Sequence, residues 1–184
     1  MVGLNTEVGY ERMIEAILYV AGRGAQDPRL GLTKIFKTLV IADVLAQSSL
    51  GHTVTRWKYM RFKNGPVPLH AKEYLEGTTD VTVMNVPVGF GRTLKRLVAH
   101  REPNMALFTD EERNLLDMAM GIACSGTADE ASELGHALPA WRWSKPDKLI
   151  PGELLGFPYL ITAEPATGSS LDLARQSLAE QSLA

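Results

Sequence analysis

The chain has 184 residues, a formal net charge of −2, a hydrophobic fraction of 45% and a single cysteine. This length fits one domain that can bury a hydrophobic core without disulfides or structural metals to stabilise it, and a single cysteine excludes an internal disulfide. The small net charge gives no overall attraction to nucleic acid or anionic lipid, and without a signal-peptide pattern or a membrane-length apolar run we expect a cytoplasmic protein.

Two amphipathic helices are expected in the first third of the chain. Apolar residues spaced by three and four over 13–21 predict a helix over about 7–22. A stronger apolar stripe over 32–45 predicts a second helix at the centre of the core, which ends before Gly51. Asp43 lies within that stripe. It is either a buried functional carboxylate or, as we favour, a residue on a solvated edge or an acceptor for a neighbouring loop.

Residues 53–62 mix aromatic and basic side chains, and their spacing suits either a helix or a strand. We favour a helix. The dipeptide Asn64-Gly65 predicts a turn after it, and Pro68 suits the first turn of a short helix over 69–76.

A β-hairpin is expected next. Residues 81–88 have the β-branched content of a strand, and Pro87 indicates a sheet edge. Residues 89–91 can form the turn. Residues 93–101 then supply the partner strand, although their leucine spacing also allows a helix.

Two helices carry a capping-box signature at their start, in which a threonine is followed three residues later by glutamate. The pairs are Thr109 with Glu112 and Thr127 with Glu130. The second of these helices is expected to end at Gly135 after about two turns.

His136 and Trp141 follow that glycine. His136 could be a general base, but we favour a structural role in which it donates to the free carbonyls at the helix end. Trp141 is expected to be a core plug more than a ligand platform. Overall we predict a mainly α (α+β) fold, a compact helical domain with a small, winged-helix-like β-hairpin over 1–163, followed by a flexible or weakly helical tail over 164–184.

The sequence holds no nucleophile elbow, phosphate loop, dinucleotide fingerprint or metal signature. Its four histidines are scattered, and Cys124 lies in a helical apolar pattern that favours a core position. We therefore predict no catalytic residues, metal or cofactor. An enzyme with an unfamiliar site around Asp43 and His136 is the least favoured of three functional hypotheses.

Residues 56–101 are locally basic, with nine lysines and arginines against three acids and hence a balance of +6. Such a segment is typical of a nucleic-acid groove, of a patch for an acidic partner protein, or of a solvated face. The residues that we predict to bind a partner are Trp57, Tyr59, Arg61, Phe62, Phe90 and Arg92.

Several motifs also occur in a definite order. The run 32–37 reads Leu-Thr-Lys-Ile-Phe-Lys, and Gly-Pro-Val-Pro follows at 65–68. A capped helix then begins after Thr109, and Glu-Leu-Gly-His at 133–136 precedes Pro-Ala-Trp at 139–141. Over residues 10–150 this order resembles the Panacea domain, also called the SocA-like antitoxin domain, with a signature here of Gly65, Pro66, Pro68, His136 and Trp141.

This resemblance implies an antitoxin of a bacterial or phage toxin–antitoxin pair, which neutralises an unrelated toxin by binding it directly. For the SocA branch it further implies an adaptor that presents the toxin to a AAA+ protease such as ClpXP. Gly135 departs from the family, which often has a small hydroxyl residue there. The alternative is a winged-helix-like DNA-binding regulator, in which the basic segment contacts phosphates. We expect no membrane partner.

Overall fold

The computed structural model describes residues 3–89 and 91–156, and it confirms a mainly α (α+β) fold. None of the helices in this part of the chain is long and apolar enough to cross a bilayer. The helices are α1 (Gly3–Arg23), α2 (Leu32–Leu50), α3 (Ala71–Gly77), α4 (Asp110–Cys124), α5 (Ala128–Ala137) and α6 (Pro139–Arg142); the strands are β1 (Tyr59–Phe62), β2 (Gly65–Pro68), β3 (Val81–Pro87) and β4 (Thr93–Ala99); the 3₁₀ turns are η1 (Met105–Leu107) and η2 (Gly152–Gly156).

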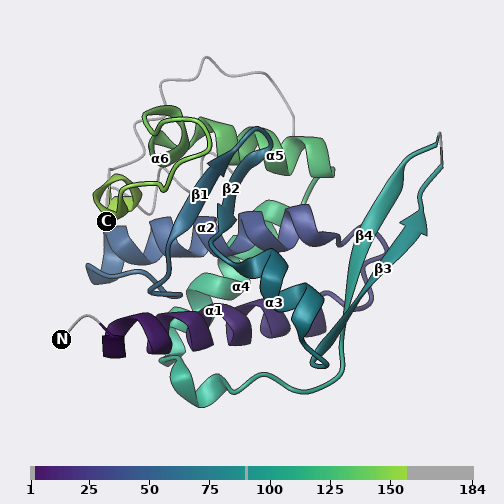
Figure 1. Ribbon diagram of the computed structural model, residues 1–184, viewed down its shortest axis with the longest axis horizontal. Helices are drawn as coiled ribbons and strands as arrows, with labels where there is room; N and C mark the ends of the chain where they lie inside the picture. Colours follow the sequence, from purple (N-terminus) through teal and green to yellow (C-terminus); the bar gives the residue numbers. More distant parts are fainter. Residues whose placement is uncertain (1–2, 90, 157–184) are drawn as a thin grey trace.

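Helix α2 is the centre of the core, as its apolar stripe predicts. Every side chain from Lys34 to Ala46 is buried, and α1, α4, α5 and strand β2 all pack against this helix (Figure 1). A helix that is covered on all sides is hydrophobic nearly all round. The polar residues inside this stretch therefore need partners from other elements.

The prediction of a helix over 53–62 is wrong, because this segment enters the β1–β2 hairpin. Strand β1 pairs antiparallel with β2, from Tyr59 opposite Pro68 to Phe62 opposite Gly65. Its other edge also has partners, since the Ile150 amide donates to the Tyr59 carbonyl at 2.8 Å. Arg56, at φ 52°, adopts a left-handed conformation that interrupts any helix.

The hairpin turn confirms the turn predicted at Asn64-Gly65. Lys63 and Asn64 form the two-residue loop, and Gly65 follows at φ +102°. The short helix after it begins at Ala71 rather than 69. Pro68 belongs to β2 and does not start α3, so its predicted place in the first helical turn is wrong.

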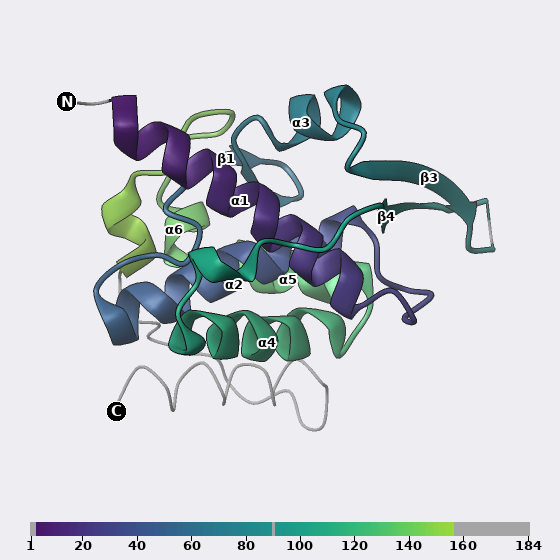
Figure 2. The same cartoon turned by 90° about the horizontal axis from the view of Figure 1, so that it is seen from below.

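Strands β3 and β4 confirm the predicted hairpin and run in register from Val81 opposite Ala99 to Pro87 opposite Thr93. This hairpin projects from the helical body in both views (Figures 1 and 2). Phe90, predicted at its tip, and the tail predicted over 164–184 lie outside the described residues.

Both capping boxes are present. The Glu112 amide donates to the Thr109 hydroxyl, and the Glu130 amide donates to the Thr127 hydroxyl, each at 3.2 Å. The predicted end of the second helix is wrong, since α5 continues past Gly135 to Ala137.

Candidate functional site: the β1–β2 hairpin and its basic hollow

Helices α5 and α6 hold the β1–β2 hairpin through its backbone carbonyls. His136 Nε2 lies 2.9 Å from the Lys63 carbonyl, which can only accept, so Nε2 carries the proton. Trp141 Nε1 donates to the Phe62 carbonyl at 2.8 Å, and Arg61 Nε donates back to the Trp141 carbonyl at 2.7 Å. His136 thus bonds to the hairpin, and the predicted bond to its own helix end is not found among the described residues.

The Trp141 ring is only partly buried, so the prediction of a core plug is wrong. The His136 ring lies 4.3 Å from it, centroid to centroid. The Arg61 guanidinium lies 4.0 Å over the same ring, within the range of a cation–π contact. Trp141 thus joins α6 to the hairpin at the surface of the protein.

A buried lysine lies beneath the hairpin. Lys37 of α2 is 1% exposed, and its ammonium donates to the Pro66 carbonyl at 3.0 Å. Burial lowers the pKa of Lys37 to about 7. The sequence analysis assigned no role to this side chain, although a lysine in a mainly apolar stripe is the kind of departure that marks one.

Glycine at two motif positions makes room for Lys37. A Cβ atom at Gly65 would lie 2.6 Å from the Lys37 ammonium, and one at Gly135 would lie 2.8 Å from Lys37 Cε. The same atom at Gly135 would lie 3.3 Å from Pro66 Cδ. The absence of a side chain at Gly135 therefore leaves the space that the Lys37 stem occupies.

We predict that Gly135→Ala destabilises the protein by about 1–3 kcal/mol, since the added methyl group overpacks the contact with Lys37. Gly121→Ala is the matched control. Gly121 also lies inside a helix, but a Cβ there meets no atom within 4 Å. That substitution should stabilise the protein by about 0.5–1 kcal/mol through helix propensity. Urea unfolding of both variants measures the difference, and equal effects would show that the Lys37 contact imposes no constraint.

A hollow of about 480 Å³ lies between the first turn of α2 and the β1–β2 hairpin. Among the described residues it is lined by four lysines and one acid, Lys37, Lys63, Lys72, Lys95 and Asp147. Its apolar lining comes from Leu32, Phe36, Phe62 and Val67, and its remaining lining from Thr33 and Asn64.

A smaller hollow of about 300 Å³ adjoins the first on the side of Arg61 and Trp141. Phe62, Lys63 and Asp147 line both hollows. Two of the predicted partner-binding residues, Arg61 and Phe62, thus lie on one concave and basic surface, which we call the hairpin surface.

The other predicted partner-binding residues lie elsewhere. Tyr59 is 1% and Trp57 9% exposed, so neither side chain is available to a partner, and their placement in an interface is corrected. Trp57 donates to the Leu69 carbonyl at 2.7 Å and the Tyr59 hydroxyl donates to the Asp43 carboxylate at 2.7 Å, so both side chains face inward. Arg92 is exposed on the β3–β4 hairpin, where it pairs with Asp129 at 3.4 Å.

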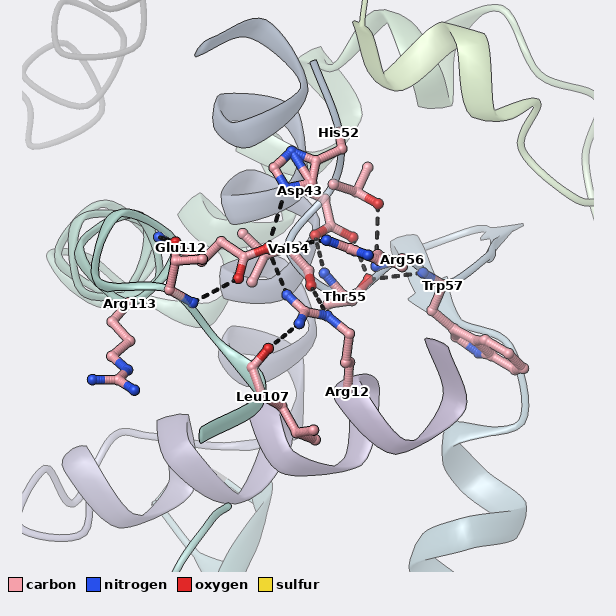
Figure 3. Close-up of polar contacts among 12 residues, drawn as sticks. Arg12, Asp43, His52, Val54, Thr55, Arg56, Trp57, Leu107, Glu112 and Arg113 are labelled. Carbon is pink, nitrogen blue, oxygen red and sulfur yellow. Dashed lines mark hydrogen bonds and ion pairs between the residues drawn. The ribbon is translucent and has the colours of Figure 1, made fainter. Parts of the chain in front are cut away.

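Asp43 is fully buried and serves as an acceptor for the loop before β1 (Figure 3). Its carboxylate accepts from the Thr55 amide at 2.8 Å, from the Thr55 hydroxyl, and from the Tyr59 hydroxyl at 2.7 Å. Burial raises the pKa of Asp43 to about 6, although these hydrogen bonds favour the charged form. The predicted role as a loop acceptor is confirmed, whereas the solvated edge is excluded.

A second buried group joins α1 to α4. Figure 3 shows Arg12 reaching from α1 to Glu112, and their side chains meet at 2.6 Å with exposures of 6% and 1%. Arg12 also donates to the Val54 carbonyl at 2.8 Å and to the Leu107 carbonyl. The other Glu112 oxygen closes the capping box by accepting from the Thr109 amide at 2.9 Å.

These buried carboxylates are satisfied by protein donors and hold elements together. Among the described residues, no hydrogen bond or ion pair joins Asp43 to His136, and no cluster of three metal-ligating side chains occurs. Cys124 packs against the core, and burial raises the pKa of its thiol, which lowers its reactivity.

No family model, no curated protein and no solved structure matches the chain. The functional argument therefore starts from the residues of this chain and from the surface that they form.

Proposed function

We propose that the protein is an antitoxin of the Panacea type, which neutralises a cognate toxin by binding it directly. One observation supports this above the others: the residues that carry the family resemblance are far apart in sequence and pack together in space. Lys37 contacts Pro66, Gly135 leaves room for Lys37, and His136 and Trp141 hold the same hairpin. A motif set that converges on one structural unit is what a shared fold requires.

The hairpin surface is the binding site that this proposal favours. It combines a half-buried aromatic residue, Phe62, with Arg61 and Lys63 on a concave face. Aromatic and arginine side chains at a hollow are the usual anchors of protein interfaces. Its positive charge would attract an acidic surface of the toxin and speed association.

The direct test is co-expression with the product of the adjacent gene. We expect the protein to restore growth and to copurify with that product. Lys63 is exposed in the hairpin loop, and Lys63→Glu should weaken both the complex and the rescue of growth. Lys58 is exposed but lies outside both hollows, so Lys58→Glu should change neither. Absence of both rescue and a complex would refute the antitoxin proposal itself.

The adaptor role needs a separate measurement. If the protein delivers the toxin to a ClpXP-type protease, the toxin should disappear faster when the protein is present, and a strain without that protease should abolish the difference. If the toxin is neutralised but its level does not fall, the protein acts by binding alone and does not deliver the toxin to the protease.

A DNA-binding regulator is the second candidate, favoured by the projecting β3–β4 hairpin (Figures 1 and 2). A two-stranded ribbon can enter the major groove, and this one carries Arg92, Lys95 and Arg96. Affinity for operator DNA that falls steeply with salt, and falls further in Lys95→Ala, would support it. The two functions can coexist in one protein.

A further inference from the structure

We propose that the basic hollow between α2 and the β1–β2 hairpin binds a small organic phosphate. The inference does not depend on the antitoxin proposal, because it follows from the lining of the hollow alone. Four lysines from four separate parts of the fold, Lys37, Lys63, Lys72 and Lys95, line it against a single acid, Asp147, among the described residues. Such an excess of positive charge at one concavity attracts an anion.

The basic residue type that lines the hollow indicates which anionic group would bind there. The described lining holds lysines and no arginine. Planar carboxylates are recognised best by the bidentate arginine fork, whereas lysine binds phosphate as a point charge. A set of lysines therefore suits a phosphate group, whose oxygens point in several directions, better than an acidic peptide.

The first two turns of helix α2 form one side of the same hollow. Leu32 and Thr33 of its first turn line the space, and Gly31 supplies no side-chain cap. This turn also holds no acidic side chain. The positive end of the helix dipole is therefore not offset by an acidic side chain of its own first turn, and it adds to the attraction of the hollow for an anion.

Lys37 provides the independent observation. Only 1% of Lys37 is exposed. Within the described residues its ammonium has a single acceptor, the Pro66 carbonyl. An ammonium has three donors, and no carboxylate is paired with this one in the described part of the chain. Burial without a counter-ion lowers the pKa of Lys37 to about 7, and a phosphate in the hollow would favour its charged form.

The dimensions fit a ligand larger than phosphate alone. A volume of about 480 Å³ is in the range of small-molecule sites, which span roughly 300–1,000 Å³. Leu32, Phe36 and Val67 give it an apolar wall, which would contact the organic part of the ligand. We therefore infer a compound of about nucleotide size.

The experiment is calorimetric titration of the full chain at low ionic strength with three probes: ATP, inorganic pyrophosphate and adenosine. We expect ATP and pyrophosphate to bind and adenosine not to bind. Lys72→Ala combined with Lys95→Ala should weaken ATP binding at least about tenfold, which corresponds to about 1.4 kcal/mol. Both side chains are exposed, so the fold should survive. Lys58→Ala, an exposed lysine outside the hollow, should change the affinity less than about twofold.

Four results would overturn the proposal. If Lys58→Ala weakens ATP binding as much as the double variant does, the attraction is a diffuse effect of surface charge. If Lys72→Ala combined with Lys95→Ala leaves the affinity for ATP unchanged, the phosphate binds elsewhere. A short aspartate-rich peptide that binds as tightly as ATP and competes with it would reassign the hollow to an acidic protein segment. Lys37→Met, checked for an intact fold by circular dichroism, should lower the affinity for pyrophosphate, and an unaltered affinity would count against the site.

Discussion

Glu112→Ala is expected to destabilise the protein by about 3–5 kcal/mol, the usual cost of leaving one partner of a buried ion pair alone. The Arg12 side chain is 6% exposed, and its guanidinium would lose its carboxylate partner at 2.6 Å while staying in the core. Arg12 could not easily turn outward, because it also donates to the carbonyls of Val54 and Leu107.

The chain provides a matched control for this substitution in Glu130→Ala. Glu130 occupies the same capping-box position in α5, and its carboxylate accepts from the Thr127 amide at 2.6 Å. Among the described residues Glu130 forms no salt bridge like that of Glu112 with Arg12, and Lys34 acts on it only through a minor electrostatic attraction, so its loss should cost far less than that of Glu112. Urea unfolding measures both. Similar losses would mean that Glu112 acts through helix capping alone.

Asp43→Ala is the second large effect, with an expected loss of about 3–5 kcal/mol. Three donors would lose their acceptor, namely the Thr55 amide, the Thr55 hydroxyl and the Tyr59 hydroxyl. Each buried donor left unsatisfied costs about 1–3 kcal/mol, and a water molecule that enters the space would recover part of the total. Thermal unfolding followed by circular dichroism would detect the change, and a loss below about 1 kcal/mol would contradict it.

Asp43 also predicts a dependence of stability on pH. Its pKa is about 6 in the folded protein and 3.8 in the reference state, so between these values the folded protein binds more protons than the unfolded chain. The contribution of Asp43 to the free energy of unfolding is therefore full below about pH 4 and falls as the pH rises toward 6.

Asp43→Asn should remove this dependence, because the amide does not titrate. The comparison is the difference in unfolding free energy between wild type and Asp43→Asn, measured from pH 4 to pH 7. We expect the wild type to lose stability relative to the variant as the pH rises. A constant difference would show that Asp43 titrates alike in both states.

Asp43 also bears on the proposed binding surface. Tyr59, which donates to it, is the first residue of β1, so the carboxylate anchors the start of the β1–β2 hairpin on α2. Lys37, His136 and Trp141 fix the same hairpin farther along. Four anchors on a short hairpin indicate that its exposed residues are held in place before a partner arrives, which lowers the entropic cost of binding.

The sequence was most informative where the signal is local. Helix α2 follows from an apolar stripe, and the starts of α4 and α5 follow from Thr-x-x-Glu motifs whose hydrogen bonds join residues three apart. The β3–β4 hairpin has the same character, because its strands adjoin and their β-branched content is high. In each case the residues that stabilise an element are its own or its neighbours.

The prediction for 53–62 failed because the deciding partners are distant. Tyr59 is fixed in its strand by the Ile150 amide and the Asp43 carboxylate, neither of which lies near it in sequence. The inward direction of Trp57 and Tyr59 was equally hidden. An aromatic and basic run has the same composition whether its rings face the core or the solvent.

The sequence by itself determined the helical core, the capped helices and the ordered motifs of the family resemblance, because these depend on periodicity and on contacts a few residues apart. Only the tertiary structure decided that Lys37 is buried, that Gly135 makes room for it, and that Lys72, Lys95 and Asp147 border one hollow. The physical reason is that a concave charged surface is formed by side chains from elements far apart in the chain, and local sequence patterns do not show which elements pack together.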